Sequence, residues 1–385
     1  MKWTHEHNEL RRTARAIIDA DINPYCDEWE KAEIYPAHEV MKKFGEAGLL
    51  GLSKPEKYGG MGLDYSFEIA FAEELGNCRA GGVSTSIGVQ TNMCSPALAR
   101  HGSDELCNEF LVPTIAGDLV GAIGVSEEGA GSDVASIKTT ARTDGDDYII
   151  NGSKMWITNG VQGDWICLLV NTDTDNGPHR NKSLVVVPLK ETGVSVARKL
   201  DKLGLHCSDT AQLFFDDVRV PQRYRIGEEN RGFIYQMEQF QEERMYAVAR
   251  SSRAVEVIVE DTIEYTSQRQ VFGRSVLDNQ VVHFKMAEFQ SRIEAIRALL
   301  YQAVETYIDG GDVTREASMA KYLIGQLVME LPSQCLQYWG GQGYMNENPV
   351  SRAFRDTRLI AIGGGANEVM LQIICKIMGI LPGNR

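Results

Sequence analysis

The sequence lacks several patterns that would identify whole classes of protein. No apolar run reaches the roughly 18 residues of a membrane-spanning helix, and the first residues carry neither an apolar signal core nor an arginine-rich transit pattern. The cysteines form no CxxC pair and lie near no histidine cluster, so neither a zinc site nor a disulfide framework is expected. A formal net charge of −14 argues against a nucleic-acid partner. We expect a soluble protein of the bacterial cytoplasm or, in a eukaryote, of the mitochondrial matrix.

Proline is absent from a long part of the chain, between Pro221 and Pro332. Because proline disrupts helix interiors, a proline-free stretch with recurring Leu, Ile, Val, Met and Ala predicts long packed helices. These helices are expected at Phe233–Arg269, Asp278–Asp309, Thr314–Gly340 and Pro349–Met378.

The first part of the chain also carries apolar residues at helical spacing, as in the run from Leu10 to Ile22 that stops at Asn23-Pro24. Further helices are predicted at His38–Leu50, Phe67–Gly76 and Ser103–Val112, the last with Ser103 as its N-cap. The middle of the chain differs, because its short apolar runs bounded by turn residues predict an antiparallel β-domain. Its strands are expected at Thr139–Arg142, Tyr148–Asn151, Asp164–Val170, Lys182–Leu189 and Ala211–Val218.

These patterns together predict an α+β fold with three domains. An N-terminal α-helical domain is placed at residues 1–118, a middle antiparallel β-domain at 119–229 and a C-terminal four-helix-bundle domain at 230–385. The helical segments on both sides of the sheet are expected to pack into one bundle. No GxGxxG motif follows a strand and opens a helix, which disfavours a nicotinamide-binding Rossmann domain.

A glycine-spaced loop at residues 123–136 can bring backbone donors close to an anion. Gly129 and Gly131 permit backbone angles and close approaches that a Cβ would block, and Ser132 and Asp133 add short polar groups. Taken alone, such a loop is more often an ordinary turn.

Two later stretches of the sequence make the functional interpretation of this loop more specific. One is Lys154-Met155-Trp156-Ile157-Thr158-Asn159; the other is Gln337-Tyr338-Trp339-Gly340-Gly341-Gln342-Gly343-Tyr344, followed by Glu347, Arg352 and Asp356. Together with the loop they resemble the signatures of the acyl-CoA dehydrogenase family, and the resemblance covers essentially the whole chain. It implies α,β-dehydrogenation of an acyl-CoA to a trans-2-enoyl-CoA in fatty-acid or branched-acyl catabolism. It also implies FAD as cofactor, an electron-transferring flavoprotein as electron acceptor and a homotetramer.

The resemblance also implies which residues contact the cofactor and the substrate. FAD would contact Ile123, Val125, Ser126, Gly131, Ser132, Trp156, Ile157, Thr158, Arg269, Gln280, Gln337, Gly340, Gly341, Ala366, Asn367 and Glu368. The acyl-CoA would contact Ser132, Gln241, Arg244, Gly364 and Gly365. No metal ligand is implied.

Two of these positions also have ordinary interpretations. A tryptophan such as Trp156 is usually a core residue, although the neighbouring Thr158 adds the donor that an isoalloxazine ring needs. Arg269 is as often a surface charge, but within Arg269-Gln270-Val271-Phe272-Gly273 it fits the family's pyrophosphate-binding arginine. In relatives, Arg269 and Gln280 would be supplied by a neighbouring subunit.

The catalytic base is where this sequence departs from much of the family. The usual base is a glutamate ahead of a Gly-Thr pair near the C-terminus, but Gly364 stands there. A subset that includes isovaleryl- and long-chain acyl-CoA dehydrogenases places the glutamate on a helix, directly before an arginine. Gln241-Glu242-Glu243-Arg244 matches that pattern, so Glu243 is the predicted base and Glu242 the alternative. Such triplets are otherwise typical of solvated helix faces.

The acyl group and the electron acceptor stay open at this point. A helix-borne base suggests a long, branched or bulky acyl chain, and Met61-Gly62-Leu63-Asp64-Tyr65 is similar to the citronellyl-CoA dehydrogenase branch. A buried glutamate beside a thioester is expected to have a raised pKa. The alternatives are a flavin acyl-CoA oxidase on the same scaffold and a non-enzymatic flavoprotein or assembly factor, the latter motivated by the glycine at position 364.

Overall fold

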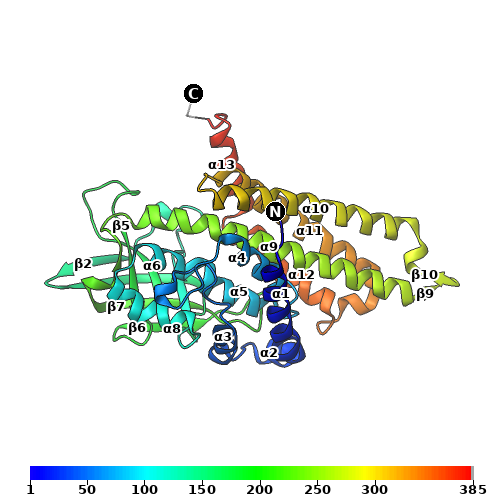
Figure 1. The fold of residues 1–385 in the computed structure, drawn as a ribbon, viewed down its shortest axis with the longest axis horizontal. Coiled ribbons are helices and arrows are strands. Elements are labelled where there is room, and N and C mark those ends of the chain that lie inside the picture. Colours follow the sequence, from blue (N-terminus) through cyan, green and yellow to red (C-terminus); the bar gives the residue numbers. More distant parts are fainter. Residues whose placement is uncertain (383–385) are drawn as a thin grey trace.

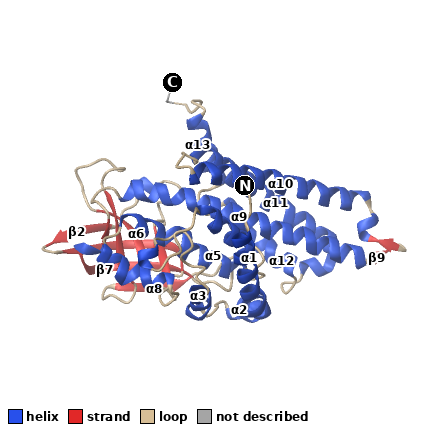
Figure 2. Ribbon diagram, in the orientation of Figure 1, coloured by secondary structure: helices blue, strands red, loops and turns tan. Residues whose placement is uncertain are grey.

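The computed structural model describes residues 1–382 and places a β-sheet at one end of the molecule, with a helical bundle extending away from it (Figures 1 and 2). Along the chain, helices come first, then strands, then longer helices. This order confirms the predicted α+β fold. Within residues 1–382 no helix is both long and apolar enough to cross a membrane.

The N-terminal helices divide between two cores: the first ones pack with the long C-terminal helices, and those after residue 94 pack against the β-sheet. Ser103 caps its helix as predicted, because its hydroxyl accepts a hydrogen bond from the Leu106 N–H at 3.1 Å. The stop at Asn23-Pro24 is a short 3-10 turn that joins the first two α-helices. The α-helices are α1 (His5–Ile17), α2 (Cys26–Ala32), α3 (Ala37–Glu46), α4 (Tyr65–Leu75), α5 (Gly81–Gly88), α6 (Ser95–His101), α7 (Asp104–Leu106) and α8 (Val112–Ile115).

The middle sheet has the strand order β6-β7-β3-β2-β4-β5-β8, with β1 beside β4. It is antiparallel except that β1 and one residue of β2 pair in parallel with β4, a mixture that the sequence pattern did not indicate. The strands are β1 (Gly121–Gly124), β2 (Thr140–Asp144), β3 (Asp147–Thr158), β4 (Trp165–Asn171), β5 (Lys182–Pro188), β6 (Val194–Lys199), β7 (Thr210–Pro221) and β8 (Arg225–Ile226). The strand predicted to end at Asn151 therefore continues to Thr158.

Long helices form the C-terminal part, and a small hairpin of β9 (Gln270–Val271) and β10 (Arg274–Ser275) marks the end of the bundle farthest from the sheet (Figure 1). The helices are α9 (Gly232–Gln268), α10 (Gln280–Ile308), α11 (Thr314–Trp339), α12 (Pro349–Thr357) and α13 (Asn367–Ile377). The first three confirm the predicted long helices to within two residues at each end.

One hydrophobic core joins the two helical parts, as expected from the sequence. Phe44 and Leu75 of the N-terminal part belong to the same buried cluster as Tyr246, Phe289 and Leu327 of the C-terminal part. Helix α9 is central to this core, because it packs against α4, α10 and α11. Burying apolar area on both sides of α9 fixes the helix that carries Glu243.

The predicted helix over Pro349–Met378 is wrong. The α-helix ends at Thr357, a short 3-10 turn follows at Arg358–Ala361, and α13 begins only at Asn367. Gly364 and Gly365 have φ angles of 64° and 90°, in the left-handed region that glycine adopts at low cost. The three consecutive glycines at 363–365 thus end the helical path and form a loop, which we call the glycine loop (residues 362–366).

Candidate active site

Glu243 lies on α9 and faces the glycine loop. A β-carbon placed on Gly364 would lie 3.0 Å from Oε1 of Glu243 and 3.7 Å from Cε of Lys321. A side chain at position 364 and the carboxylate of Glu243 would therefore compete for the same space. Positions 243 and 364, which the sequence resemblance gave as alternative places for the base, therefore converge at one point although they are far apart in sequence.

Lys321 on α11 holds the glycine loop in place. Its buried ammonium group donates hydrogen bonds to the carbonyl oxygens of Ile360 at 2.5 Å, Gly363 at 3.0 Å and Gly365 at 3.2 Å. Burial lowers the pKa of Lys321 to about 8, although the negative charge of Glu243 opposes this shift. Lys321 thus fixes the backbone of the glycine loop through hydrogen bonds, and it also places a positive charge near the carboxylate of Glu243.

The carboxyl group of Glu243 has a raised pKa. Part of the side chain remains accessible, but protein surrounds the carboxyl group closely enough for desolvation to raise its pKa. The positive charges of Arg244 and Lys321 limit the increase. A carboxylate with a raised pKa is a stronger base than an ordinary solvated glutamate, which is what proton abstraction from carbon requires.

Glu242 has different surroundings. Arg100 donates to both of its carboxylate oxygens, at 2.8 and 3.1 Å, and the Tyr307 hydroxyl donates at 2.6 Å. The backbone carbonyl of Glu242 also accepts a hydrogen bond from the Tyr65 hydroxyl at 2.9 Å. These contacts occupy both carboxylate oxygens of Glu242, so its geometry is that of a structural ion pair.

We expect Glu242→Gln to destabilise the fold without removing the base. The substitution leaves the partly buried Arg100 without its carboxylate, and the cost is about 1–3 kcal/mol in the free energy of unfolding. Chemical denaturation of the variant and the wild type measures this difference. An unchanged denaturation midpoint would contradict a structural role for the pair.

Arg244 and Gln241 lie on the same stretch of α9 as Glu243. Arg244 is buried, its Nε has no hydrogen-bond partner, and one terminal nitrogen reaches Gln241 Oε1 only at 3.5 Å. Burial lowers the pKa of this guanidinium, while Glu243 opposes the change. A buried arginine with unused donors can hold an incoming polar group.

The predicted cofactor loop lies beside the end of β3. The Met155 N–H donates to the Ser126 carbonyl at 2.9 Å. Trp156 has a φ of 60°, unusual for a bulky residue, at an irregularity in the β3–β7 pairing, and it is 55% exposed. The core interpretation of Trp156 is therefore wrong, because its indole stands out from the strand as a free aromatic surface.

The two glycines of this loop do not have the backbone angles or close protein contacts that the sequence predicted for them. Neither Gly129 nor Gly131 has a positive φ, and a β-carbon on either would meet no protein atom within 4 Å. The protein itself makes no close approach there, and open space remains beside the backbone. A shallow cleft of about 240 Å³ runs along this loop between Glu127 and Ser153.

A buried ion pair supports the same loop. Lys154 donates to the Val125 carbonyl at 3.0 Å and to Glu127 at 2.9 Å, and it is fully buried. Burial lowers the pKa of Lys154 to about 8, although Glu127 opposes the shift. Lys154 thereby fixes the start of the loop to β3, although sequence reasoning had only placed it in a motif.

A second group of predicted residues lies at the opposite end of the bundle. Arg269 follows α9 and donates to the Trp339 carbonyl at 2.8 Å, which brings it against Gly340. Gln280 begins α10, and Gln337 and Gly341 stand at the end of α11. At about 1.5 Å of rise per residue, α9 separates Glu243 from Arg269 by about 39 Å. One chain therefore does not bring this group to Glu243.

The residues predicted at the start of α13 lie after the glycine loop. Ala366 is the N-cap residue, and Asn367 is buried with its Oδ1 against Gly325 of α11 and without a hydrogen-bond partner. Glu368 is exposed.

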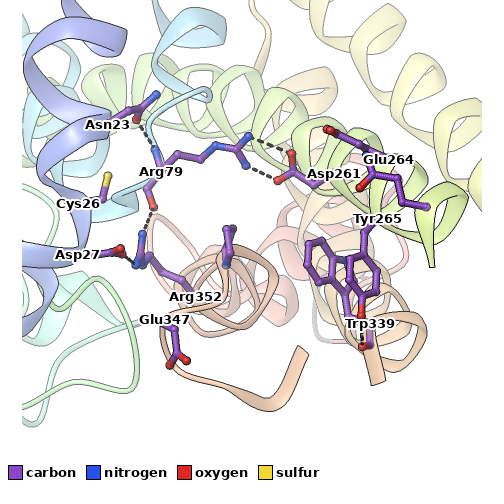
Figure 3. A pocket seen from close by; sticks show the side chains of 12 residues that line it. Asn23, Cys26, Asp27, Arg79, Asp261, Glu264, Tyr265, Trp339, Glu347 and Arg352 are labelled. Atoms are coloured by element: carbon purple, nitrogen blue, oxygen red, sulfur yellow. Dashed lines mark hydrogen bonds and ion pairs between the residues drawn. The ribbon is translucent and has the colours of Figure 1, made fainter. Parts of the chain in front are cut away.

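A cleft lies away from Glu243, between the first helices and the far half of the bundle. It measures about 470 Å³ and includes Tyr265 and Trp339, whose rings stack 4.0 Å apart (Figure 3). Arg79 pairs with Asp261 on its wall. Because Tyr265 and Trp339 also hold Arg269, this cleft adjoins the second group of predicted residues and not the glutamate.

Lys321 and Arg100 were missed by sequence reasoning. Lys321 could have been noticed, since it falls in register with Ala317, Ile324 and Val328 on the buried face of α11. A lysine on an apolar helix face needs buried acceptors. Arg100 gave no such signal, because its partner Glu242 lies 142 positions away in the sequence.

Family models for the N-terminal, middle and C-terminal domains of acyl-CoA dehydrogenases match residues 4–118, 122–218 and 230–379. The chain therefore belongs to the acyl-CoA dehydrogenase family, as its motifs predicted. The predicted enzyme class is confirmed at the level of this family.

Individual proteins give the same result over the whole chain. The mitochondrial long-chain specific acyl-CoA dehydrogenase of Sus scrofa is 37% identical over 378 residues, which cover 97% of this chain and 86% of that protein. The crystal structure of acyl-CoA dehydrogenase from Geobacillus kaustophilus has a TM-score of 0.93 at 37% identity and covers 98% of both chains. The structure of PigA with FAD and proline has a TM-score of 0.94 at 25% identity and covers 99% of both chains.

Proposed function

We propose that this protein is an FAD-dependent acyl-CoA dehydrogenase in which Glu243 removes the α-proton of the thioester. The observation that carries the proposal is the 3.0 Å separation between the Glu243 carboxylate and the β-carbon position of Gly364. The glycine loop carries no carboxylate at position 364, but Glu243 of α9 provides one at the same point. This geometry also favours Glu243 over Glu242, whose carboxylate is held by Arg100 and Tyr307.

The glycine loop suits the thioester oxygen. Within residues 1–382, the N–H groups of Gly364 and Gly365 donate to no protein acceptor. Such free donors can stabilise the negative charge that develops on the thioester oxygen when the α-proton leaves. Lys321 holds these donors in place through the loop carbonyls, while Arg244, Gln241 and Ser132 would bind polar parts of the acyl-CoA.

The residues expected to hold FAD fit a flat aromatic cofactor with a pyrophosphate. Trp156 offers an exposed indole beside Thr158, and open space lies next to the backbone at Gly131. A bound flavin would supply the acceptor for the hydride from Cβ, a role that no protein side chain can perform. Trp156 and Thr158 would contact the ring and orient it.

A homotetramer is proposed from the separation of the two predicted groups of residues. Arg269 lies about 39 Å from Glu243 along α9, and Gln280 and Gln337 lie toward the same end of the bundle, so these residues would complete the cofactor site of a neighbouring copy. Arg269 would then contact the pyrophosphate with its guanidinium group. A chain that binds FAD fully as a monomer would contradict this arrangement.

Turnover with different electron acceptors tests the proposed activity. We expect steady enoyl-CoA formation with electron-transferring flavoprotein and little oxygen consumption. Rapid peroxide release without this partner would instead establish an acyl-CoA oxidase. A yellow protein that is unaffected by every acyl-CoA would establish a binding or assembly protein.

The pH dependence of the reaction tests the roles of Glu243 and Lys321 together. Because Glu243 must be ionised to accept a proton, the rate should rise as the pH increases through its raised pKa. Lys321→Met removes a positive charge that lowers this pKa, so the rise should move to higher pH. Stopped-flow flavin bleaching over a pH series measures the midpoint.

Lys182→Met provides a matched control for that series. Lys182 is also buried, and burial lowers its pKa, but it donates to the Pro178 carbonyl and not to the glycine loop. Its midpoint should equal that of the wild type. Equal midpoints in all three proteins would contradict the coupling between Lys321 and Glu243.

A further inference from the structure

The backbone has an unusual conformation at the end of β3, where cofactor contacts are expected. Trp156 and Asn159 have φ angles of 60° and 64°, so two non-glycine residues in the left-handed region flank Ile157 and Thr158. The pairing of β3 with β7 is irregular over the same part of the strand. A bulky residue keeps such an angle only where its surroundings fix the backbone. The contacts of this strand end therefore decide where the exposed indole and Thr158 stand.

Asn159 connects this strand end to the start of β1. Its side chain is 1% exposed, and its Nδ2 donates a hydrogen bond to the Gly121 carbonyl at 2.9 Å. Gly121 begins β1, which leads directly into the loop at residues 123–136. The backbone carbonyl of Asn159 also accepts a hydrogen bond from the Gly163 N–H at 2.7 Å. Asn159 thus joins the two segments of the chain that are expected to contact the cofactor.

A buried chain of hydroxyl groups continues from Asn159 into the N-terminal domain. The Ser86 hydroxyl on α5 donates to Asn159 Oδ1 at 2.5 Å, and the Tyr35 hydroxyl lies 2.5 Å from Ser86 Oγ. Because a serine has only one hydroxyl proton, Tyr35 is the donor to Ser86. Burial raises the pKa of Tyr35, so its proton stays in place at neutral pH. The hydrogen bonds therefore run in one direction, from Tyr35 through Ser86 to Asn159.

Asp209 supports the turn that follows Asn159 from another side. It is buried, and its carboxylate accepts hydrogen bonds from the backbone N–H groups of residues 161 and 162 at 3.1 and 3.2 Å. The next residue, Thr210, pairs with Thr158 between β7 and β3. Asp209 thus holds the turn to β7, whereas Asn159 holds the strand end to β1 and α5.

We propose that Asn159 is a positioning residue that holds Trp156 and Thr158 in the geometry required for FAD. The hydroxyl groups of Ser86 and Tyr35 support Asn159 in this role. The proposal rests on the proposed function, because it takes Trp156 and Thr158 as cofactor contacts. Removing the Asn159 amide would release the strand end from β1 while β3 stays paired with β7, so the flavin would be held less tightly.

Release of flavin from purified, flavin-loaded proteins tests this role. Asn159→Gly permits the same φ angle but removes the amide, so it separates the side-chain hydrogen bonds from the backbone conformation. After dilution at a temperature well below unfolding, its flavin should dissociate about 10- to 100-fold faster than that of the wild type. The rise in free-flavin fluorescence measures this rate. The visible absorption bands of the bound flavin should also shift, because the ring contacts at Trp156 and Thr158 change.

Tyr35→Phe tests the far end of the hydroxyl chain. It removes the donor to Ser86 but leaves the hydrogen bond between Ser86 and Asn159. We expect it to accelerate flavin release less than about fivefold, which is less than the effect of Asn159→Gly. A larger effect in Tyr35→Phe than in Asn159→Gly would contradict the central place of the asparagine.

Asn230→Gly is the matched control. Asn230 also has a φ of 64°, and its side chain accepts a hydrogen bond from Thr172 at 2.8 Å. It lies between β8 and α9, where its N–H donates to Ser183 of β5, and not at the end of β3. Flavin should therefore leave this variant at the wild-type rate. Equal acceleration in both asparagine variants would indicate a general loss of stability and would overturn the positioning role.

The other outcomes separate this proposal from the proposed function. An Asn159→Gly protein with the wild-type release rate and absorption spectrum would overturn the role of Asn159 and leave the dehydrogenase intact. If the wild type takes up no FAD, the proposed function itself fails. Should Asn159→Gly not fold, Ser86→Ala makes the same test, because it removes the donor to Asn159 Oδ1. Faster flavin release is expected from Ser86→Ala, and release at the wild-type rate would overturn the proposal.

Discussion

Glu243→Gln should slow flavin bleaching by acyl-CoA by about 100- to 10,000-fold, the range by which a positioned general base accelerates proton transfer. Glutamine keeps nearly the size and shape of glutamate, so the glycine loop and the bound flavin should remain in place. The neutral amide cannot accept the α-proton, and this loss is the dominant effect. Anaerobic stopped-flow spectroscopy of both proteins at equal flavin content measures it.

Glu242→Gln is the matched control for this experiment, because it makes the same chemical change one position earlier in α9. Its bleaching rate should stay close to that of the wild type, since Arg100 and Tyr307 already engage the Glu242 carboxylate. If Glu242→Gln loses the reaction and Glu243→Gln keeps it, the assignment of the base is reversed.

Moving the carboxylate back to the loop should restore part of the activity that Glu243→Ala loses. A glutamate side chain at position 364 starts 3.0 Å from the Glu243 carboxylate, so Glu243→Ala combined with Gly364→Glu places a base in nearly the same space. We expect the double variant to bleach at least about tenfold faster than Glu243→Ala alone. Its stability should fall by about 1–2 kcal/mol, because a non-glycine residue at position 364 keeps a φ of 64°.

The single variant Gly364→Glu should instead be impaired. Two carboxylates in contact cannot both stay ionised, so the pKa of one must rise strongly and the loop must shift to separate them. Thermal denaturation and the bleaching rate of the single and double variants test this pairing. A single variant as stable and active as the wild type would show that the two side chains do not share a site.

The sequence alone predicted the long helices well, because proline-free apolar periodicity extends over many turns. It did not predict the break after Thr357, although the three glycines at 363–365 were visible. Periodicity on both sides of the break suggested one helix, and the loop depends on Lys321 from another helix for its carbonyl partners. Such long-range contacts leave little trace in a local pattern.

In the candidate site, too, some features follow from the sequence and others depend on contacts between residues remote in sequence. Resemblance to the family selected Glu243, but nothing local distinguishes it from Glu242. The distinction comes from Arg100 and Tyr307, which reach Glu242 from helices remote in sequence, and from the glycine loop, which faces Glu243. In the same way, the resemblance grouped Arg269 with the cofactor residues, but the length of α9 separates Arg269 from Glu243 by about 39 Å.

The measurement that tests this account most directly is anaerobic mixing of the flavin-loaded wild type with butyryl-, isovaleryl- and palmitoyl-CoA. The account predicts that at least one acyl-CoA bleaches the flavin rapidly, with about one enoyl-CoA formed for each flavin reduced. A protein that binds flavin and acyl-CoA but leaves the flavin oxidised with every probe would contradict it, whatever the geometry of Glu243.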